Sequence, residues 1–326
     1  MTHIVYMFPG QSSRYESMIE KLSALDPACR QVIRQASDVL GFDVAAHYRQ
    51  SNDQAFARNV DVQLGVFIAN HLFLTLLDRA GVEAVASAGL SLGEWNHLVH
   101  INALSFEDAL LAVQARGRAY DDGPRGQMAS IFPLPLDVLS ETLADLEGVE
   151  IVNLNSPRQN VISGTQQAVE RALELVLDEH YVEGVVIERD VPMHSTLFEP
   201  VAERFAATLR ELPFRRPQLP YMPNRTAKPI AAPTRDQYVE LLSSHVARPV
   251  LWRETIDNFV EELGRDNVAL VEVGPRAVLT NLLDRKWHKG IKKHSCDSRE
   301  ETAAHLEGLV ETLAGYREAL PLREAV

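Results

Sequence analysis

The segment AVASAGLSLGEW at 84–95 constrains the fold more than any other part of the chain. Its first residues are small or β-branched and predict a short buried strand. The pattern Gly89-x-Ser91-x-Gly93 then predicts a tight turn into a helix. Such a turn leaves little room for a Cβ atom on either side of the serine, and the helix that follows offers amide donors to an oxyanion. We therefore predict that Ser91 is a nucleophile, although this pattern by itself also occurs in ordinary loops.

The other predicted elements alternate as in an α/β fold. Between 126 and 194 the order is β-α-β-β-α-β, which is typical of a ferredoxin-like subdomain. We expect a large α/β-hydrolase-like domain (1–125 and 195–326) with a parallel sheet and the nucleophile turn, and an inserted ferredoxin-like subdomain (126–194). Strands are predicted at 3–8, 84–88, 128–132, 149–154, 160–163, 185–191, 219–222 and 267–273. Helices are predicted at 18–39, 63–77, 105–116, 136–146, 165–177, 199–212, 238–246, 253–263 and 300–316, with one more through Leu279 and Leu282 that continues into the basic residues after it.

Two residues outside the nucleophile turn are candidates for a functional site. His194 follows the last strand of the insertion, where the chain returns to the large domain. A single histidine is more often structural than catalytic, but a domain junction is a frequent position for a cleft. Arg116 lies near the end of a predicted helix, where a positive charge is favourable. The alternative interpretation is a carboxylate clamp, because a guanidinium pairs with a carboxylate through two hydrogen bonds.

Composition excludes several classes of function. The net charge of −13 argues against nonspecific binding to nucleic acid. No apolar run approaches the ~18 residues of a membrane span. The N-terminus lacks the basic and apolar regions of a signal peptide, so we expect a cytoplasmic protein without a membrane partner. Cys29 and Cys296 lie far apart in no metal-ligand or redox spacing, and we expect both to be unpaired and no metal to be bound.

One short basic run stands out from this acidic background. Five positive charges fall within nine positions, at Arg285, Lys286, Lys289, Lys292 and Lys293. The ordinary interpretation is a solvated helix end and loop. The alternative is a docking patch for an acidic partner.

Eight separate motifs occur in one order along residues 3–290. They are Phe8-Pro9-Gly10-Gln11, Gln63, Gly89-Leu90-Ser91-Leu92-Gly93-Glu94, Arg116-Gly117, Asn155-Ser156-Pro157 with Ile162-Ser163-Gly164, Val191-Pro192-Met193-His194, Arg248-Pro249-Val250 and Glu272-Val273-Gly274-Pro275. In sequence and spacing they resemble the malonyl-CoA:acyl-carrier-protein transacylase family. That family includes stand-alone acyltransferases of fatty-acid synthesis and of trans-acyltransferase polyketide synthases.

The resemblance implies a ping-pong acyl transfer at Ser91, with His194 as the base and the backbone amides of Gln11 and Leu92 as the oxyanion hole. The acyl group would come from coenzyme A or from the phosphopantetheine of a carrier protein, with no permanently bound cofactor. The imidazole needs no acidic partner if a carbonyl or an amide orients it. The family usually places glutamine or asparagine there, and the matching position is His245, so the orienting group stays open.

The resemblance also assigns a substrate pocket. Arg116, with Gln63 nearby, matches the arginine that pairs with the free carboxylate of a malonyl group. Three positions depart from the housekeeping enzymes and suggest a reshaped pocket. They are Leu90, where histidine is usual and which is associated with trans-acting polyketide enzymes, Trp95, where tyrosine is usual, and Met193, at a position linked to acyl choice.

Several alternatives remain at this point. Because carrier proteins are acidic, the basic run together with Arg299 becomes a candidate docking patch. The cargo is most simply malonyl from coenzyme A. It could instead be an aminoacyl or peptidyl unit moved between carriers, or the enzyme could be an editing hydrolase. An α/β-hydrolase esterase explains Gly-x-Ser-x-Gly but not the loop at 8–11 or the insertion. A non-catalytic binding module is the remaining alternative.

Overall fold

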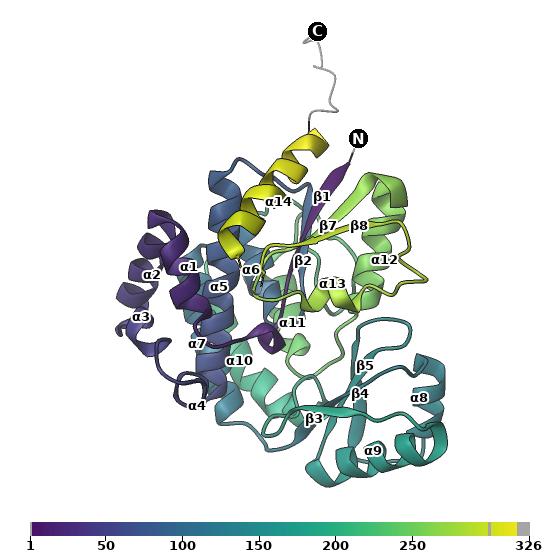
Figure 1. The fold of residues 1–326 in the computed structure, drawn as a ribbon. Helices are drawn as coiled ribbons and strands as arrows, with labels where there is room; N and C mark the ends of the chain where they lie inside the picture. Colours follow the sequence, from purple (N-terminus) through teal and green to yellow (C-terminus); the bar gives the residue numbers. More distant parts are fainter. Residues whose placement is uncertain (1, 299–300, 318–326) are drawn as a thin grey trace.

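Four parallel strands form the main sheet of the computed structural model, which describes residues 2–298 and 301–317. The strands are β1 (His3–Phe8), β2 (Ala86–Gly89), β7 (Val268–Glu272) and β8 (Lys292–Ser295). Their order across the sheet is β2-β1-β7-β8, so the first strand lies between segments far from it in the sequence (Figure 1). Parallel strands end at one edge, and the loops that follow β1, β2 and β7 therefore meet there.

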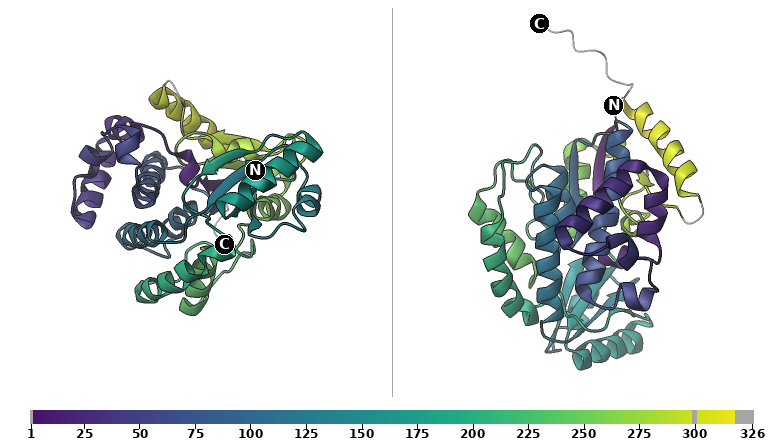
Figure 2. Two further views of the ribbon diagram at one scale, coloured as in Figure 1. Left: turned by 90° about the horizontal axis from the view of Figure 1, so that it is seen from below. Right: turned by 90° about the vertical axis from the view of Figure 1, so that its left-hand side faces the viewer.

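Different helices cover the two faces of this sheet (Figures 1 and 2). Side chains alternate along a strand, so Ile4, Tyr6 and Phe8 of β1 enter a core with α5, α6, α7 and α14. Val5 and Met7 enter a second core with α12 and α13. The helices around the sheet are α1 (Met18–Leu25), α2 (Pro27–Leu40), α3 (Val44–His47), α4 (Asn52–Ala55), α5 (Asn59–Arg79), α6 (Gly93–His100), α7 (Phe106–Asp121), α10 (Glu199–Glu211), α11 (Arg235–His245), α12 (Trp252–Leu263), α13 (Val278–Leu282) and α14 (Thr302–Arg317). Coverage of both faces by helices confirms the predicted α/β class with a parallel sheet.

The helix α5 is buried along most of its length. Its side chains are buried around almost the whole circumference, as the apolar pattern at 63–77 predicts. By length and composition it could also cross a membrane, contrary to our expectation for the chain, but 83% of its most apolar window is buried inside the protein. Burial of this kind is typical of a core helix.

A second, antiparallel sheet is built from the central part of the chain. Its strands are β3 (Gln127–Ile131), β4 (Val149–Leu154), β5 (Asn160–Gly164) and β6 (Val185–Glu188), in the order β4-β5-β3-β6. The helices α8 (Leu136–Thr142) and α9 (Gln166–His180) pack on one face through a separate core. The other face adds Met128, Val152 and Val161 to the core of the main sheet. The backbone of Val250 also pairs with β4, which joins the two parts of the chain.

Two predicted elements are wrong. The segment 219–222 makes only a single bridge, between Tyr221 and Ile230, because Pro220 and Pro223 remove the amide donors of a ladder. The helix at 279–282 does not continue into the basic run, since the Asp284 carboxylate accepts the next amides and forms a turn. The chain then enters β8, a strand that the sequence analysis missed.

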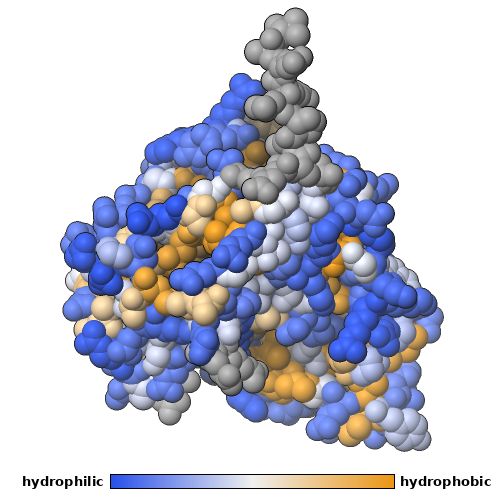
Figure 3. All heavy atoms as spheres, turned by 45° about the horizontal axis from the view of Figure 1, so that its top comes forward, coloured by the Kyte–Doolittle hydropathy of each residue, from blue (hydrophilic) through white to orange (hydrophobic). Residues whose placement is uncertain are grey.

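The C-terminal helix α14 covers an edge of the core. The helix predicted at 300–316 is confirmed from Thr302 onward, with Leu306, Leu309 and Leu313 buried. A groove of about 290 Å³ remains between α14 and the ends of α1 and α5, lined mostly by apolar side chains. The molecular face in Figure 3 is otherwise largely hydrophilic, with hydrophobic side chains gathered in limited areas.

Candidate active site

The predicted strand, turn and helix around Ser91 are present: β2 is the strand, α6 is the helix, and Ser91 lies in the turn between them. Ser91 has a φ of +52°, a left-handed conformation that is strained for a residue with a side chain. A Cβ atom on Gly89 would lie 2.0 Å from the carbonyl of Gly93, and one on Gly93 would lie 2.0 Å from the Phe8 carbonyl oxygen. Both glycines are therefore required by close backbone packing, which confirms the interpretation of the Gly-x-Ser-x-Gly pattern.

His194 contacts Ser91 directly. The distance from Ser91 Oγ to His194 Nε2 is 2.8 Å, and His194 Nδ1 lies 2.7 Å from the backbone carbonyl oxygen of His245. Because a carbonyl only accepts, Nδ1 carries the proton and Nε2 is free to accept the proton of Ser91. Burial, together with the neighbouring His245 and Arg116, lowers the pKa of His194 well below its usual range, so the imidazole is neutral at pH 7.

The carbonyl of His245 therefore fills the position that sequence analysis left open. His194 is further fixed by its own backbone, whose amide donates to the carbonyl of Val246 at 3.0 Å. The imidazole rings of His194 and His245 stack with centroids 4.9 Å apart. Any residue type could supply the carbonyl, so the identity of residue 245 does not predict this contact.

Arg116 is buried beside the serine. Its Nη1 donates to Gln63 Oε1 at 2.8 Å, its Nη2 lies 3.3 Å from Ser91 Oγ, and its guanidinium stacks over the ring of Tyr120. The side chain is only 1% exposed, yet it forms no ion pair with any carboxylate in the described part of the chain. Burial lowers the pKa of Arg116, but a guanidinium stays charged at neutral pH. The arrangement leaves a buried positive charge next to the nucleophile.

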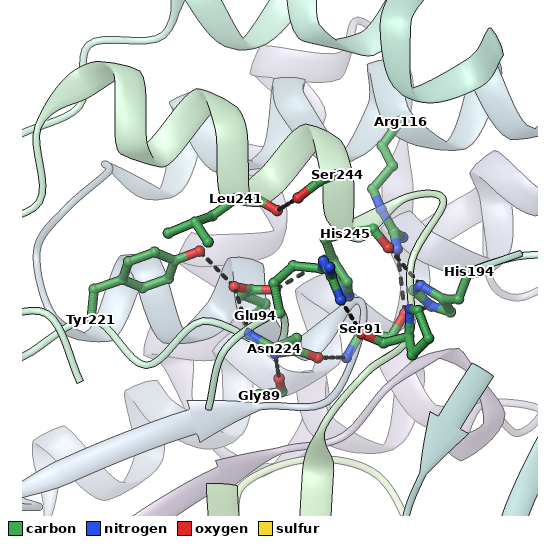
Figure 4. Close-up of polar contacts among 12 residues, drawn as sticks. Gly89, Ser91, Glu94, Arg116, His194, Tyr221, Asn224, Leu241, Ser244 and His245 are labelled. Atoms are coloured by element: carbon green, nitrogen blue, oxygen red, sulfur yellow. Dashed lines mark hydrogen bonds and ion pairs between the residues drawn. The ribbon is translucent and has the colours of Figure 1, made fainter. Parts of the chain in front are cut away.

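Sequence analysis missed a polar network behind the nucleophile turn (Figure 4). Asn224 Oδ1 accepts the amide of Ser91 at 2.8 Å, and Asn224 Nδ2 donates to the Gly89 carbonyl at 2.6 Å. Glu94 accepts from Tyr221 Oη at 2.6 Å and lies 3.0 Å from His245 Nδ1. The only signal in the sequence is the residue type of Glu94 within the nucleophile motif, and its partners lie more than 100 positions away.

The two predicted oxyanion residues follow the neighbouring strands β1 and β2. Leu92 follows Ser91 at the N-terminus of α6, and Gln11 begins a short 3₁₀ turn after β1. The side chain of Gln11 donates to Glu188 of β6 at 2.7 Å, and Arg14 pairs with the same carboxylate at 3.2 Å. A cavity of about 580 Å³ adjoins this turn, lined by Ser12, Arg14, Tyr15, Phe56, Ala57, Ile187 and Arg276.

The structure places the three variant positions differently. Leu90 and Met193 are buried and directly precede Ser91 and His194, respectively. Trp95, in contrast, is 1% exposed and packs edge-on against Phe205 of α10 in the core, so it occupies a core position on α6.

The basic run is at the surface. Arg285, Lys286, Lys289 and Lys293 are exposed, while Lys292 is half-buried and donates to the carbonyl of Asp266. The predicted sixth member, Arg299, lies outside the described residues. Cys29 and Cys296 are both buried and unpaired, which confirms that they form no disulfide. Within residues 2–298 and 301–317, no cluster of three metal-ligating side chains occurs.

Comparison with known proteins gives consistent matches along nearly the whole chain. Residues 5–315 match the family described as acyl transferase domain. The chain is 28% identical to the malonyl CoA-acyl carrier protein transacylase of Bacillus subtilis (strain 168), over 95% of this chain and 98% of that protein. It is 31% identical to the same enzyme of Salmonella typhimurium, over 87% and 93%. It is 32% identical to the polyketide biosynthesis protein ThaF of Burkholderia thailandensis, over 85% of this chain and 24% of that protein.

Solved structures match in the same way. The structure of FabD from Acinetobacter baumannii has a TM-score of 0.86 and 28% identity, covering 96% of this chain and 99% of that one. A solved structure described as a type II PKS acyl-carrier protein in complex with its malonyl-transacylase (PlMCAT:AntF) contains a chain that matches with a TM-score of 0.84 and 28% identity. The match covers 94% of this chain and 100% of that chain.

Proposed function

This chain belongs to the acyl transferase domain family, and we propose that it moves a malonyl group from coenzyme A to an acyl carrier protein in fatty-acid or polyketide synthesis. The similarity to malonyl CoA-acyl carrier protein transacylases supports this reaction, and the similarity to ThaF supports a polyketide setting as one of the two. Ser91 would carry the malonyl group between donor and acceptor.

The first half-reaction forms an ester on Ser91. Its Oγ attacks the thioester carbonyl carbon while its proton passes to His194 Nε2, and the carbonyl oxygen becomes an oxyanion. We assign the backbone amides of Gln11 and Leu92 as donors to that oxyanion. Collapse of the intermediate breaks the carbon–sulfur bond, and His194 returns the proton to the leaving sulfur of coenzyme A.

The second half-reaction uses the same groups in reverse. The phosphopantetheine thiol of the carrier gives its proton to His194, and its sulfur attacks the ester carbonyl. The carbon–oxygen bond then breaks, and Ser91 Oγ recovers the proton. No permanently bound cofactor is needed, because donor and acceptor both arrive as thioester and thiol.

The observation that carries the choice of malonyl is the unpaired charge of Arg116. Leaving a charge buried without a partner is costly, and a protein of this kind compensates with a ligand of opposite charge. Arg116 Nη2 lies 3.3 Å from Ser91 Oγ, close enough for an acyl group on that oxygen to place its terminal carboxylate against the guanidinium. A plain acyl group would leave the guanidinium unpaired.

Intact-mass measurement of the purified protein tests this function. After incubation with malonyl-CoA we expect a malonyl adduct on the protein and none on Ser91→Ala. The adduct should disappear, with acylation of the carrier, when a carrier protein is added. Labelling from an acylated carrier but not from malonyl-CoA would instead indicate carrier-to-carrier transfer. Release of free acid without carrier acylation would indicate an editing hydrolase.

We place carrier docking at the basic run after α13, through Arg285, Lys286, Lys289, Lys292 and Lys293. The exposure of four of these side chains, all but Lys292, on an acidic chain supports attraction of an acidic carrier, by steering more than by affinity. We also treat residues 126–194 as a ferredoxin-like subdomain inserted into the large domain. Its support is the strand order β4-β5-β3-β6 with both helices on one face.

A further inference from the structure

Glu94 occupies a central position behind the reacting side chains. It lies in the first turn of α6, three residues after Ser91, and is 1% exposed. An acidic residue at this end of a helix is favourable by itself, because it faces the positive end of the helix dipole. The Glu94 carboxylate, however, also makes contacts away from the helix, and its two oxygens point in different directions (Figure 4).

One oxygen leads to Ser91. Glu94 Oε1 accepts from Tyr221 Oη at 2.6 Å and from the backbone amide of Asn224 at 3.3 Å. The side chain of Asn224 in turn spans the nucleophile turn, since it accepts from the amide of Ser91 and donates to the carbonyl of Gly89. The strained φ of Ser91 is therefore held by a residue whose own backbone is bound to Glu94.

The other oxygen leads to His194. Glu94 Oε2 lies 3.0 Å from Nδ1 of His245, whose ring is buried and stacked on the ring of His194. His245 is the last residue of α11, and its carbonyl accepts from His194 Nδ1. Holding the His245 side chain thus also fixes the carbonyl that orients the base.

We propose that Glu94 is a positioning residue for both members of the catalytic pair, holding Ser91 through Asn224 and His194 through His245. This inference rests on the proposed roles of Ser91 and His194 but not on the identity of the acyl group. Among residues 2–298 and 301–317, no carboxylate contacts Ser91 or His194 directly. Glu94 orients the base indirectly, through His245, and it also aligns the nucleophile, through Asn224.

The test uses the rate at which a neutral phosphonofluoridate labels Ser91, measured by intact mass. This reagent needs both an aligned serine and its base but no thioester. If the parent protein forms no malonyl adduct with malonyl-CoA, the proposed function is refuted, but the labelling rates still test the role of Glu94. Glu94→Gln and His245→Leu should each slow labelling by about 100-fold, the typical consequence of displacing a reacting group by about 1 Å.

The combination of substitutions separates a shared network from independent effects. If Glu94 acts on His194 through His245, the double variant Glu94→Gln/His245→Leu should lose little more than Glu94→Gln alone. His245→Gln should restore most of the rate lost in His245→Leu, because the glutamine side chain again places an amide N–H near Glu94 Oε2, where His245 Nδ1 lies at 3.0 Å. Losses that multiply to about 10,000-fold, or equal rates for His245→Gln and His245→Leu, would overturn the proposal.

Two further variants guard against a general loss of structure. Glu272 is another buried glutamate; it ends β7 and accepts a hydrogen bond from the backbone amide of Thr280. The variant Glu272→Gln should label at the parent rate. If Glu94→Gln does not fold, Tyr221→Phe removes a single donor from Glu94 Oε1 and should slow labelling several-fold with the fold retained. A Glu94→Gln protein that labels as fast as the parent, or an unchanged rate in Tyr221→Phe, would refute the role of Glu94.

Discussion

Replacement of Arg116 by glutamine should convert a selective acyltransferase into an unselective one. The glutamine amide keeps a polar group near Gln63 but removes the buried charge that lies 3.3 Å from Ser91 Oγ. A malonyl carboxylate bound by the guanidinium forks would lose up to two charge-assisted hydrogen bonds, each worth about 1.5–3 kcal/mol. Part of this energy compensates the desolvation of the carboxylate, so the lower figure for two bonds, about 3 kcal/mol, is the one to use.

A loss of about 3 kcal/mol corresponds to a decrease of about 100-fold in kcat/KM for malonyl-CoA. For acetyl-CoA, which has no carboxylate, kcat/KM should stay the same or rise, because the apolar acyl group no longer faces an unpaired charge. The assay measures both substrates with the same carrier protein and compares the ratio of their kcat/KM values.

Arg118 provides the matched control, since it lies two residues further along α7 and is exposed. Arg118→Gln should leave the malonyl-to-acetyl ratio unchanged. The thermal midpoint of Arg116→Gln should not fall, because the substitution removes a buried charge that pairs with no carboxylate of residues 2–298 and 301–317. A ratio that stays at the parent value, or an equal loss of activity toward both substrates, would refute the clamp.

Three other predictions test separate parts of the structure. Gly89→Ala should lower the free energy of unfolding in urea by at least about 1–3 kcal/mol, because its Cβ would overlap the backbone of Gly93. Gly308→Ala in α14, whose added Cβ would meet no atom within 4 Å, should be neutral or stabilising. Similar losses at both positions would contradict the packing argument. Because the pKa of His194 is lowered, this base becomes protonated only at lower pH. In a plot of kcat/KM against pH, activity should therefore fall on the acid side with a midpoint below pH 6.5, the ordinary histidine value. A midpoint at or above pH 6.5 would show that burial does not set this pKa. The double variant Lys286→Glu/Lys289→Glu should raise KM for the carrier protein and make that KM less dependent on salt concentration. The rate of Ser91 acylation by malonyl-CoA should be unchanged. An unchanged KM for the carrier protein would refute the docking patch.

Local features of the chain are the part that sequence analysis predicts well. The nucleophile turn is specified by glycines within a few residues of Ser91, and α5 is specified by its apolar pattern. The strand β8 was missed because its sequence, Lys-Lys-His-Ser, carries no strand pattern. It pairs because β7 presents a free edge, so tertiary context decides its conformation.

The same distinction holds within the candidate site. Ser91, His194 and Arg116 were predicted from motifs and from the resemblance, and the structure brings these three together. The carbonyl of His245 could not be predicted, since every residue has one. The contacts of Glu94 with Tyr221 and His245 join positions 127 and 151 residues apart, and no short-range pattern records them.

The contact of Gln11 and Arg14 with Glu188 bears on how this enzyme could be recombined with its relatives. Glu188 ends β6, six residues before the proposed base His194, so the segment 126–194 carries that residue and also contacts the turn that begins at Gln11. We therefore expect that this segment cannot be exchanged as an independent module. A chimera that imports 126–194 from a relative would need to bring partners for Gln11 and Arg14, and for the Val250 backbone that pairs with β4, or it would gain a new pocket wall and lose the alignment of its reacting groups.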